Sequence, residues 1–87
     1  MFIIIVYDVE QERVNNVNKF LKRYLYWRQN SVFEGEIPDS QLEIIKSTLK
    51  SLIDEQFDSV YIYKLPSRKY LEIEVIGIEK NPRENIL

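Results

Sequence analysis

The chain has 87 residues, a formal net charge of −2, and neither histidine nor cysteine. A chain of this length forms one domain with a core of modest depth. The missing residue types exclude Ser-His-Asp and Cys-His catalysis and the two-histidine cleavage of RNA, and they argue against a zinc site. The remaining chemistry is that of carboxylates with a hard cation, or of Lys, Arg and Tyr, so any enzyme hypothesis points to Mg²⁺ or Mn²⁺.

The first residues lack the pattern of a targeting signal. They contain no basic n-region, and the apolar run from Phe2 to Tyr7 is too short to span a membrane. The absence of cysteine also excludes a disulfide framework. We therefore expect a cytoplasmic protein with no membrane partner.

The apolar run ends in a single acid, Asp8. A continuous apolar run of this kind is typical of a strand that is buried on both faces. In layered α/β proteins, ligands collect beyond the carboxyl ends of strands, so Asp8 is a candidate metal ligand. The spacing from Asp8 to Gln11 also fits a capping box, in which Asp8 begins a helix. Spacing leaves both interpretations open, and they do not exclude each other.

Asp8 alone makes a poor metal site. Mg²⁺ typically takes one or two carboxylates and keeps several waters. No other acid stands at an obviously matching strand end in the sequence. A two-fold dimer that brings two Asp8 side chains together would supply the second carboxylate, and such pairing is the commonest oligomeric arrangement.

Charge is divided unevenly along the chain. Residues 13–33 carry five basic side chains and no acidic one, whereas residues 34–58 carry seven acids against two lysines. This pattern predicts an acidic side and a basic side that could meet phosphate. The five cations are Arg13, Lys19, Lys22, Arg23 and Arg28.

Two stretches have helical periodicity. Apolar residues recur at three- and four-residue steps between residues 10 and 25, and again between residues 40 and 54. Ser40 followed by Glu43 fits a capping box at the start of the second stretch. The expected apolar stripes are Val14, Val17, Leu21 and Tyr24 in the first helix and Leu42, Ile45, Leu49 and Leu52 in the second.

The remaining segments have the character of strands. Residues 26–36 are extended, and Gln29-Asn30 is either a tight turn between two short strands or part of one bent strand. Gly35 indicates a bulge or a close approach of the backbone. Residues 60–65 are β-branched and aromatic, and residues 71–75 alternate between apolar and acidic side chains.

With Gln29-Asn30 as a turn, the order of elements predicts an α+β fold. The fold is a ferredoxin-like βαββαβ sandwich with an additional C-terminal strand, in which two helices cover one face of an antiparallel sheet. We expect residues 1–78 to form this domain and residues 79–87 to form a C-terminal tail. Many unrelated functions use this fold, so the fold does not choose among them.

Three further residues are candidates for phosphate contact. Arg13 and Arg28 could each hold a phosphate through a bidentate guanidinium, and the alternative is a solvated surface arginine. Ser31 could hydrogen-bond a phosphate or a metal-bound water, and the alternative is a strand hydroxyl that bonds to the backbone. Tyr26 and Trp27 flank Arg28 and could stack on bases, although packing or a dimer contact is the simpler interpretation.

Several stretches, in this order, resemble the small CRISPR-associated endoribonuclease family, the non-integrase subunit of the spacer-acquisition complex. Residues 5–9, Ile-Val-Tyr-Asp-Val, are similar to the family's first strand with its metal-binding aspartate, and Arg13-Val14 to the arginine that opens the first helix. The most specific stretch is residues 28–35, Arg-Gln-Asn-Ser-Val-Phe-Glu-Gly. Residues 58–63 resemble the third main strand, and Ile76-Gly77 matches the glycine after the last one.

The resemblance implies a ferredoxin-like homodimer in which two facing Asp8 residues share one Mg²⁺ ion, with Mn²⁺ as an alternative. Members of the family are described as metal-dependent nucleases on single-stranded RNA or double-stranded DNA. They are also described as the bridge that holds integrase dimers on foreign DNA. By this resemblance Asp8 ligates the metal, and Arg13, Arg28 and Ser31 position phosphate or water.

The expected function is therefore that of a Mg²⁺-dependent endonuclease-type protein of the CRISPR adaptation module, with a second copy, an integrase subunit and nucleic acid as partners. One alternative is a non-catalytic dimeric scaffold that bridges integrase dimers on double-stranded DNA. Another is a ribonuclease toxin without an integrase partner, and a third is a small regulatory domain that binds a metabolite. The sequence leaves RNA and DNA, and catalyst and scaffold, open.

Overall fold

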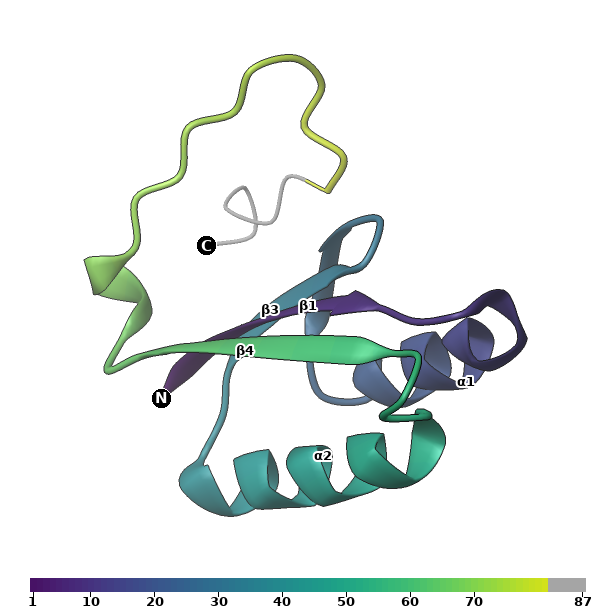
Figure 1. Ribbon diagram of the computed structural model, residues 1–87. Helices are drawn as coiled ribbons and strands as arrows, with labels where there is room; N and C mark the ends of the chain where they lie inside the picture. Colours follow the sequence, from purple (N-terminus) through teal and green to yellow (C-terminus); the bar gives the residue numbers. More distant parts are fainter. Residues whose placement is uncertain (82–87) are drawn as a thin grey trace.

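The computed structural model describes residues 1–81, which form a four-stranded antiparallel sheet with two helices on one face (Figure 1). The strand order is β2-β3-β1-β4, which is that of a ferredoxin-like βαββαβ sandwich, so the predicted fold class is confirmed. In chain order the elements are β1 (Phe2–Asp8), α1 (Gln11–Leu21), β2 (Tyr26–Gln29), β3 (Val32–Glu36), α2 (Asp39–Leu52) and β4 (Ser59–Leu65), then a 3₁₀ turn at Arg68–Tyr70. No helix in the described part of the chain combines the length and apolar character that crossing a membrane requires.

The central strand β1 is hydrogen-bonded to β3 on one edge and to β4 on the other. Side chains alternate between the two faces of a strand. Ile3, Ile5 and Tyr7 therefore point toward the helices and are at most 4% exposed. Val6 and Asp8 point to the opposite side of the sheet, which we call the open face. The sheet thus buries one face beneath the helices and carries Asp8 on the other.

The apolar stripes of both helices pack against the sheet as predicted, although the helix bounds differ. α1 ends at Leu21 rather than near residue 25, and α2 begins at Asp39. The predicted capping box at Ser40 is wrong, because Pro38 occupies the N-cap of α2 and Ser40 lies within the first turn. The buried helix residues are Val17, Leu21, Leu42, Ile45 and Leu49.

Residues 26–36 form two short strands joined by a tight turn, which settles the alternative in favour of two strands. Asn30 has a φ of 39°, in the left-handed region that Asn tolerates better than most residues. Of the two roles suggested for Gly35, the close approach is right, since a Cβ there would lie 2.9 Å from Leu25 Cδ2. The register shift lies in β2 instead, between Trp27 and Gln29.

The additional C-terminal strand predicted at residues 71–75 is absent from residues 1–81. The segment pairs with no strand there, because after the 3₁₀ turn it crosses the open face toward β2 rather than running beside β4 (Figure 1). A strand needs a neighbouring edge to hydrogen-bond with, and this path supplies none. Of the predicted tail at residues 79–87, the part from residue 82 onward lies outside the described residues, including Glu84, Ile86 and Leu87.

Two adjacent isoleucines of α2 test which face of the helix carries the core. Ile45 is fully buried, whereas Ile44 is 50% exposed. Ile45→Ala should lower the free energy of unfolding by about 2–5 kcal/mol, because it removes buried methyl groups and leaves a cavity. Ile44→Ala should change it by less than about 0.5 kcal/mol. Urea unfolding of both variants measures the difference, and equal losses would contradict this packing.

Candidate functional site at the carboxyl end of the central strand

Asp8 is the last residue of β1 and is the register partner of Ser59, the first residue of β4. Its side chain is exposed on the open face. Within residues 1–81 it has no hydrogen-bond or ion-pair partner. The capping interpretation is wrong, because the N-cap of α1 is Glu10, two residues later, and no side chain caps that helix by this route. The carboxylate of Asp8 is thus available to a ligand.

Ser31 lies at the same end of the sheet as Asp8. Its carbonyl oxygen accepts a hydrogen bond of 3.1 Å from the backbone N–H of Tyr7, the residue before Asp8. The Ser31 side chain is half-buried, and within the described chain its hydroxyl makes no hydrogen bond to the backbone. The backbone of Ser31 therefore lies at the end of the sheet that carries Asp8, opposite Tyr7 in the register of β1 and β3 rather than opposite Asp8 itself.

Tyr7 stands next to Asp8 in the sequence but points into the core. It is 4% exposed, and its hydroxyl donates a hydrogen bond to Asn18 Oδ1 of α1. Its ring stacks with that of Phe33, with the centroids 6.2 Å apart. Burial raises the pKa of Tyr7 to about 12. The phenol of Tyr7 therefore stays protonated, and it is not part of the candidate site on the open face.

Arg13 is held by a carboxylate that the sequence did not single out, that of Asp58. The Nε of Arg13 donates to Asp58 Oδ2 at 2.6 Å, and Nη2 donates to Oδ1 at 3.0 Å, in a bidentate pair. The side chain of Asp58 has no exposed area, and that of Arg13 is 23% exposed. Glu10 and Glu12 flank the same guanidinium at 3.6 and 3.8 Å. Arg13 is therefore neutralised within the chain and is not a solvated surface arginine.

Asp58 is the hydrogen-bonding centre of this end of the molecule. Besides Arg13, it accepts from the backbone N–H groups of Glu10 at 3.0 Å and Asp54 at 2.8 Å. The hydrogen bonds from Arg13, with the two backbone bonds and the nearby positive charge, hold the pKa of the Asp58 carboxyl well below its usual range, against the effect of burial. The same pair raises the pKa of Arg13 above its usual range. The sequence carried a signal only for the local bond to Asp54, since Asp side chains often accept from backbone N–H groups three or four residues earlier, and none for the pair with Arg13.

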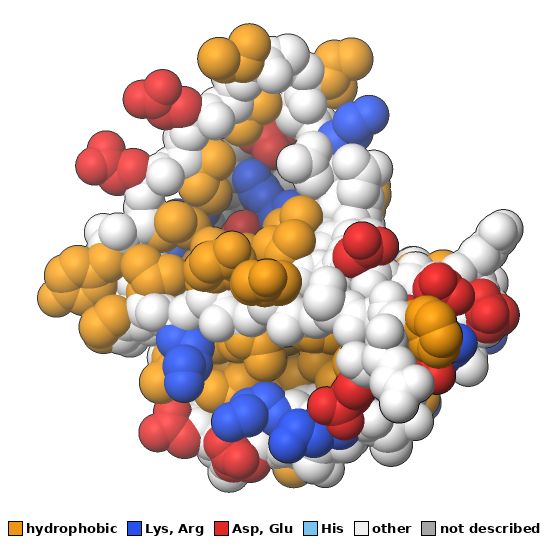
Figure 2. Space-filling model, viewed as in Figure 1, with side chains coloured by type: hydrophobic (Ala, Val, Ile, Leu, Met, Phe, Trp, Pro, Cys, Tyr) orange, Lys and Arg blue, Asp and Glu red, His pale blue; other side chains and the backbone are white. Residues whose placement is uncertain are grey.

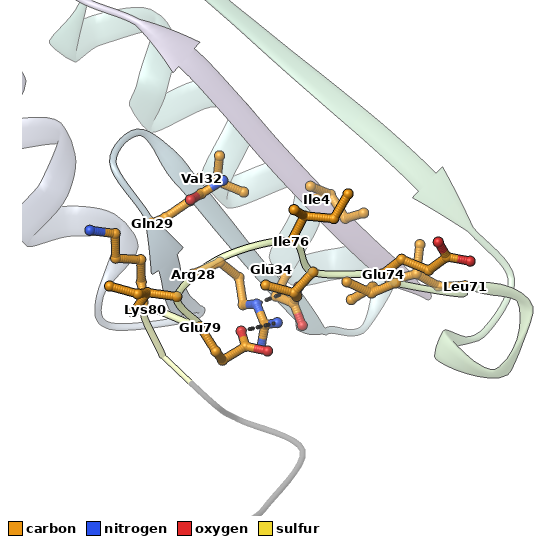
Figure 3. Close-up of a pocket in the computed structure, with 13 residues that line it drawn as sticks. Ile4, Arg28, Gln29, Val32, Glu34, Leu71, Glu74, Ile76, Glu79 and Lys80 are labelled. Carbon is orange, nitrogen blue, oxygen red and sulfur yellow. Dashed lines mark hydrogen bonds and ion pairs between the residues drawn. The ribbon is translucent and has the colours of Figure 1, made fainter.

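Arg28 lies on the open face beneath the C-terminal segment and is 9% exposed. Figure 3 shows its guanidinium between two carboxylates, those of Glu34 and Glu79, at 3.4 and 3.0 Å. Nη1 also donates to the carbonyl oxygen of Asn81 at 3.1 Å. Because β3 separates β2 from β1 in the sheet, Arg28 does not stand beside Asp8. The structure therefore places Arg28 in a buried ion cluster, away from the other candidates.

A pocket of about 360 Å³ lies between the C-terminal segment and the open face (Figure 3). Its floor includes Ile4 and Val32, and its roof includes Ile76 and Ile78. In Figure 2 the hollow above the sheet contains basic and acidic side chains, with hydrophobic side chains around it. Since Arg28 is already paired there with carboxylates, the pocket does not present an open cation to a phosphate.

The pairing of two arginines with acids changes the expected basic side. Of the five cations in residues 13–33, Arg13 and Arg28 are occupied by acids, so the sequence count overstated the exposed positive charge. The other three, Lys19, Lys22 and Arg23, are exposed at the end of α1 and just after it. Within residues 1–81 none of these three has an ion-pair partner.

The described residues contain no ready-made metal site. Among residues 1–81, no group of three or more Asp, Glu, His or Cys side chains comes together closely enough to hold an ion. Asp8 fits a hard cation by its donor type, since it is an unengaged carboxylate at a strand end. One carboxylate per chain is, however, only half of the predicted site.

The arrangement defines a small ferredoxin-like protein whose candidate site is one unengaged aspartate at the end of its central strand. The family model for the CRISPR associated protein Cas2 matches residues 1–73. Two curated relatives named "CRISPR-associated endoribonuclease Cas2", from Pyrococcus furiosus and Thermococcus kodakarensis, are 56% and 55% identical over 87 residues, which is 100% of this chain and of each relative. This chain belongs to the Cas2 family.

Solved structures agree with this assignment. A structure described as "Crystal structure of cas2" is 51% identical, covers 94% of this chain and 92% of its own, and superposes with a TM-score of 0.87. Cas2 from Streptococcus pyogenes, at 32% identity, covers 88% of this chain and 100% of its own, with a TM-score of 0.79. The resemblance seen in the sequence is thus confirmed.

The ion pair at Asp58 makes a prediction about acid stability. Because the folded chain lowers the pKa of Asp58, the pair stabilises the fold above the unfolded pKa of about 4, and this contribution is lost as the pH falls below that value. The free energy of unfolding should decrease as the pH is lowered from about 5 to 2. Asp58→Asn should be less stable at neutral pH and should show a smaller decrease. Urea unfolding across this range measures it, with Asp54→Asn as the control, and an unchanged slope in Asp58→Asn would be contrary evidence.

Proposed function

We propose that this chain is a metal-dependent endoribonuclease of CRISPR adaptation, in which Asp8 residues from two copies hold one Mg²⁺ or Mn²⁺ ion. The class of enzyme is the one that the curated relatives carry in their names. The observation that carries the metal proposal is the exposed Asp8 carboxylate, which has no partner within residues 1–81 although it closes the central strand. A carboxylate kept free in this position suits a hard cation.

The open face supports a pairing of two copies. Tyr61 and Tyr63 of β4 are 61% and 53% exposed there, with ring centroids 6.4 Å apart. Ile76 and Ile78 of the C-terminal segment are 99% and 81% exposed. Figure 2 shows hydrophobic side chains gathered along β4 and the segment that follows it. Covering such a face with a second copy removes apolar area from water and brings the second Asp8 to the same side.

The chemistry is divided between the ion and the chain. When bound, the ion activates a water for attack on a phosphodiester and stabilises the developing negative charge. Asp8 holds the ion, and the Ser31 hydroxyl orients a phosphate oxygen or a water beside it. Arg13 and Arg28 contribute as structural cations in this proposal, since their guanidinium groups are occupied by Asp58 and by Glu34 and Glu79.

The nucleic acid would lie along the exposed cations at the C-terminal end of α1 and just after it. Lys19, Lys22 and Arg23 are the members of the predicted basic side that remain exposed. They can neutralise phosphates without base recognition, which suits a substrate chosen by its backbone.

The second candidate is a non-catalytic scaffold that bridges integrase dimers on double-stranded DNA. It is favoured by the fact that no group of three or more potential metal ligands comes together within residues 1–81 of one chain. In this case the exposed cations bind duplex DNA, and the integrase contacts lie elsewhere on the dimer.

The first prediction of the proposal is a homodimer in solution. Sedimentation at micromolar concentration should give twice the mass of the chain. Tyr61→Glu combined with Tyr63→Glu should shift the protein to monomer, because four charges would be buried in the dimer. Ile44→Glu, on the exposed side of α2, is the control and should remain dimeric. A wild-type protein that sediments only as a monomer would rule out the shared ion.

Salt dependence tests the basic surface. The affinity for nucleic acid should fall by about 0.9 log units per decade of salt for each duplex phosphate that is neutralised. Replacement of Lys19, Lys22 and Arg23 by Ala should weaken binding and flatten this slope. The matched control replaces Lys46 and Lys50 of α2 by Ala and should leave the slope unchanged. A wild-type affinity that ignores salt would contradict binding through this surface.

Asp8→Asn tests the metal site itself. Asn is as large as Asp but lacks the charge that a hard cation needs. The melting temperature should stay within about 4 °C of wild type, as for a surface substitution, while Mg²⁺-dependent cleavage of single-stranded RNA falls to background. The paired measurements are a melt and a cleavage assay, each with Mg²⁺ and with EDTA.

The matched control for this experiment is Asp39→Asn, which removes an exposed carboxylate from the first turn of α2. It should cleave as wild type does. Cleavage that survives Asp8→Asn, or that ignores EDTA, would exclude the aspartate as metal ligand. A wild-type protein that binds duplex DNA but cleaves nothing would instead favour the scaffold.

A further inference from the structure

We propose that Asp58 is a positioning residue for Asp8, and that Arg13 acts by locking Asp58 rather than by touching the substrate. This inference rests on the proposed function, because the purpose of the positioning is to aim the Asp8 carboxylate. The metal proposal alone does not require this role of Asp58, because the buried Asp58 is not one of the proposed metal ligands.

The first argument is the number of segments that Asp58 joins. Its two carboxylate oxygens accept four hydrogen bonds, from two nitrogens of Arg13 and from the backbone of Glu10 and Asp54. Glu10 precedes α1, Arg13 is in its first turns, and Asp54 follows α2. One fully buried side chain thus ties the start of one helix to the end of the other.

The second argument is the place of this tie relative to Asp8. Asp8 pairs in register with Ser59, which directly follows Asp58. On the other side, Val9 alone separates Asp8 from Glu10, whose N–H donates to Asp58 at 3.0 Å. The backbone that leaves Asp8 is therefore fixed by strand pairing before it and by Asp58 after it, which limits the directions open to the Asp8 side chain.

The third argument is charge. Asp58 is a second carboxylate close to Asp8 in the fold, yet its four hydrogen bonds leave no oxygen for a cation. Arg13 compensates its charge through a bidentate contact that Lys cannot reproduce. The pair of Arg13 and Asp58 holds the segment between β1 and α1 in place without competing with Asp8 for the ion. Removal of Arg13 would leave Asp58 as an uncompensated buried charge.

The experiment has a first arm that needs neither metal nor substrate. Amide hydrogen exchange of the full chain is measured for wild type, Asp58→Asn, Asp58→Ala and Arg13→Lys. The exchange rates at Glu10 and Asp54 should rise at least tenfold in the Asp58 variants, and less in Arg13→Lys, while those at the centre of β1 stay as in wild type. Asp54→Asn is the matched control, because within residues 1–81 its carboxylate accepts its hydrogen bond from the N–H of Gln56 in its own loop.

The second arm measures Mn²⁺ alone, through the broadening of the Asp8 and Val9 amide signals. The Mn²⁺ concentration at the midpoint should rise at least fivefold in Asp58→Asn and Arg13→Lys and should not move in Asp54→Asn. The Mg²⁺ concentration for half-maximal cleavage should rise in parallel. A merely structural role would reduce the folded fraction at high temperature but would leave both midpoints unchanged well below the melting temperature.

The outcomes separate this inference from the proposed function. If wild type binds Mn²⁺ at Asp8 and cleaves RNA, but Asp58→Asn keeps the wild-type midpoint, the positioning role is overturned and the function stands. If wild type binds Mn²⁺ without cleaving and Asp58→Asn raises the midpoint, the nuclease activity is overturned and the positioning role stands. If wild type shows neither broadening at Asp8 nor cleavage, both are overturned. If Asp58→Ala does not fold, the results for Asp58→Asn and Arg13→Lys decide whether Asp58 has the positioning role.

Discussion

The pairing of β1 on both of its edges is the constraint from which the candidate site follows. A strand between two neighbours must alternate, so each residue is assigned to one face with no freedom to turn. Tyr7 therefore points into the core, where its hydroxyl donates a hydrogen bond to Asn18, and Asp8 points to the open face. A shift of one residue would bury the acid and expose the phenol. The hydrogen bonds of β3 and β4 to β1 therefore fix the availability of the Asp8 carboxylate.

Charge in this molecule is organised by burial. Both arginines singled out as phosphate ligands lie in ion clusters, Arg13 with Asp58 and Arg28 with Glu34 and Glu79. Buried charges are costly unless they are paired, so each cluster fixes which segments of the chain meet. The exposed cations near the end of α1 remain available to attract negatively charged groups at long range. A count of charges along a sequence does not distinguish these two uses.

The fold was predictable to the extent that local patterns determine it. The strand at β1, both helical stripes and the turn near Asn30 have short-range signatures, and each is present. The segment at residues 71–75 has an equally clear alternation, yet it forms no strand within residues 1–81, because pairing depends on which edge the chain passes. The role of Asp58 could not be predicted for the same reason, namely that it depends on a contact between distant segments. Its partner Arg13 lies 45 residues away, and nothing in the spacing joins them. Asp8 could be singled out as a candidate because its signal, an acid that ends an apolar run, is local.

The contact between Arg28 and Glu79 spans 51 residues, with the sheet and both helices lying earlier in the chain than the segment that carries Glu79. The face that this segment covers is made by residues of β1, β2 and β3, so the segment can close only on a sheet that has already formed. The folding chain therefore passes through a stage in which its open face is bare and Arg28 has not yet met Glu79. In that stage the apolar side chains of the face are exposed to water and to other chains.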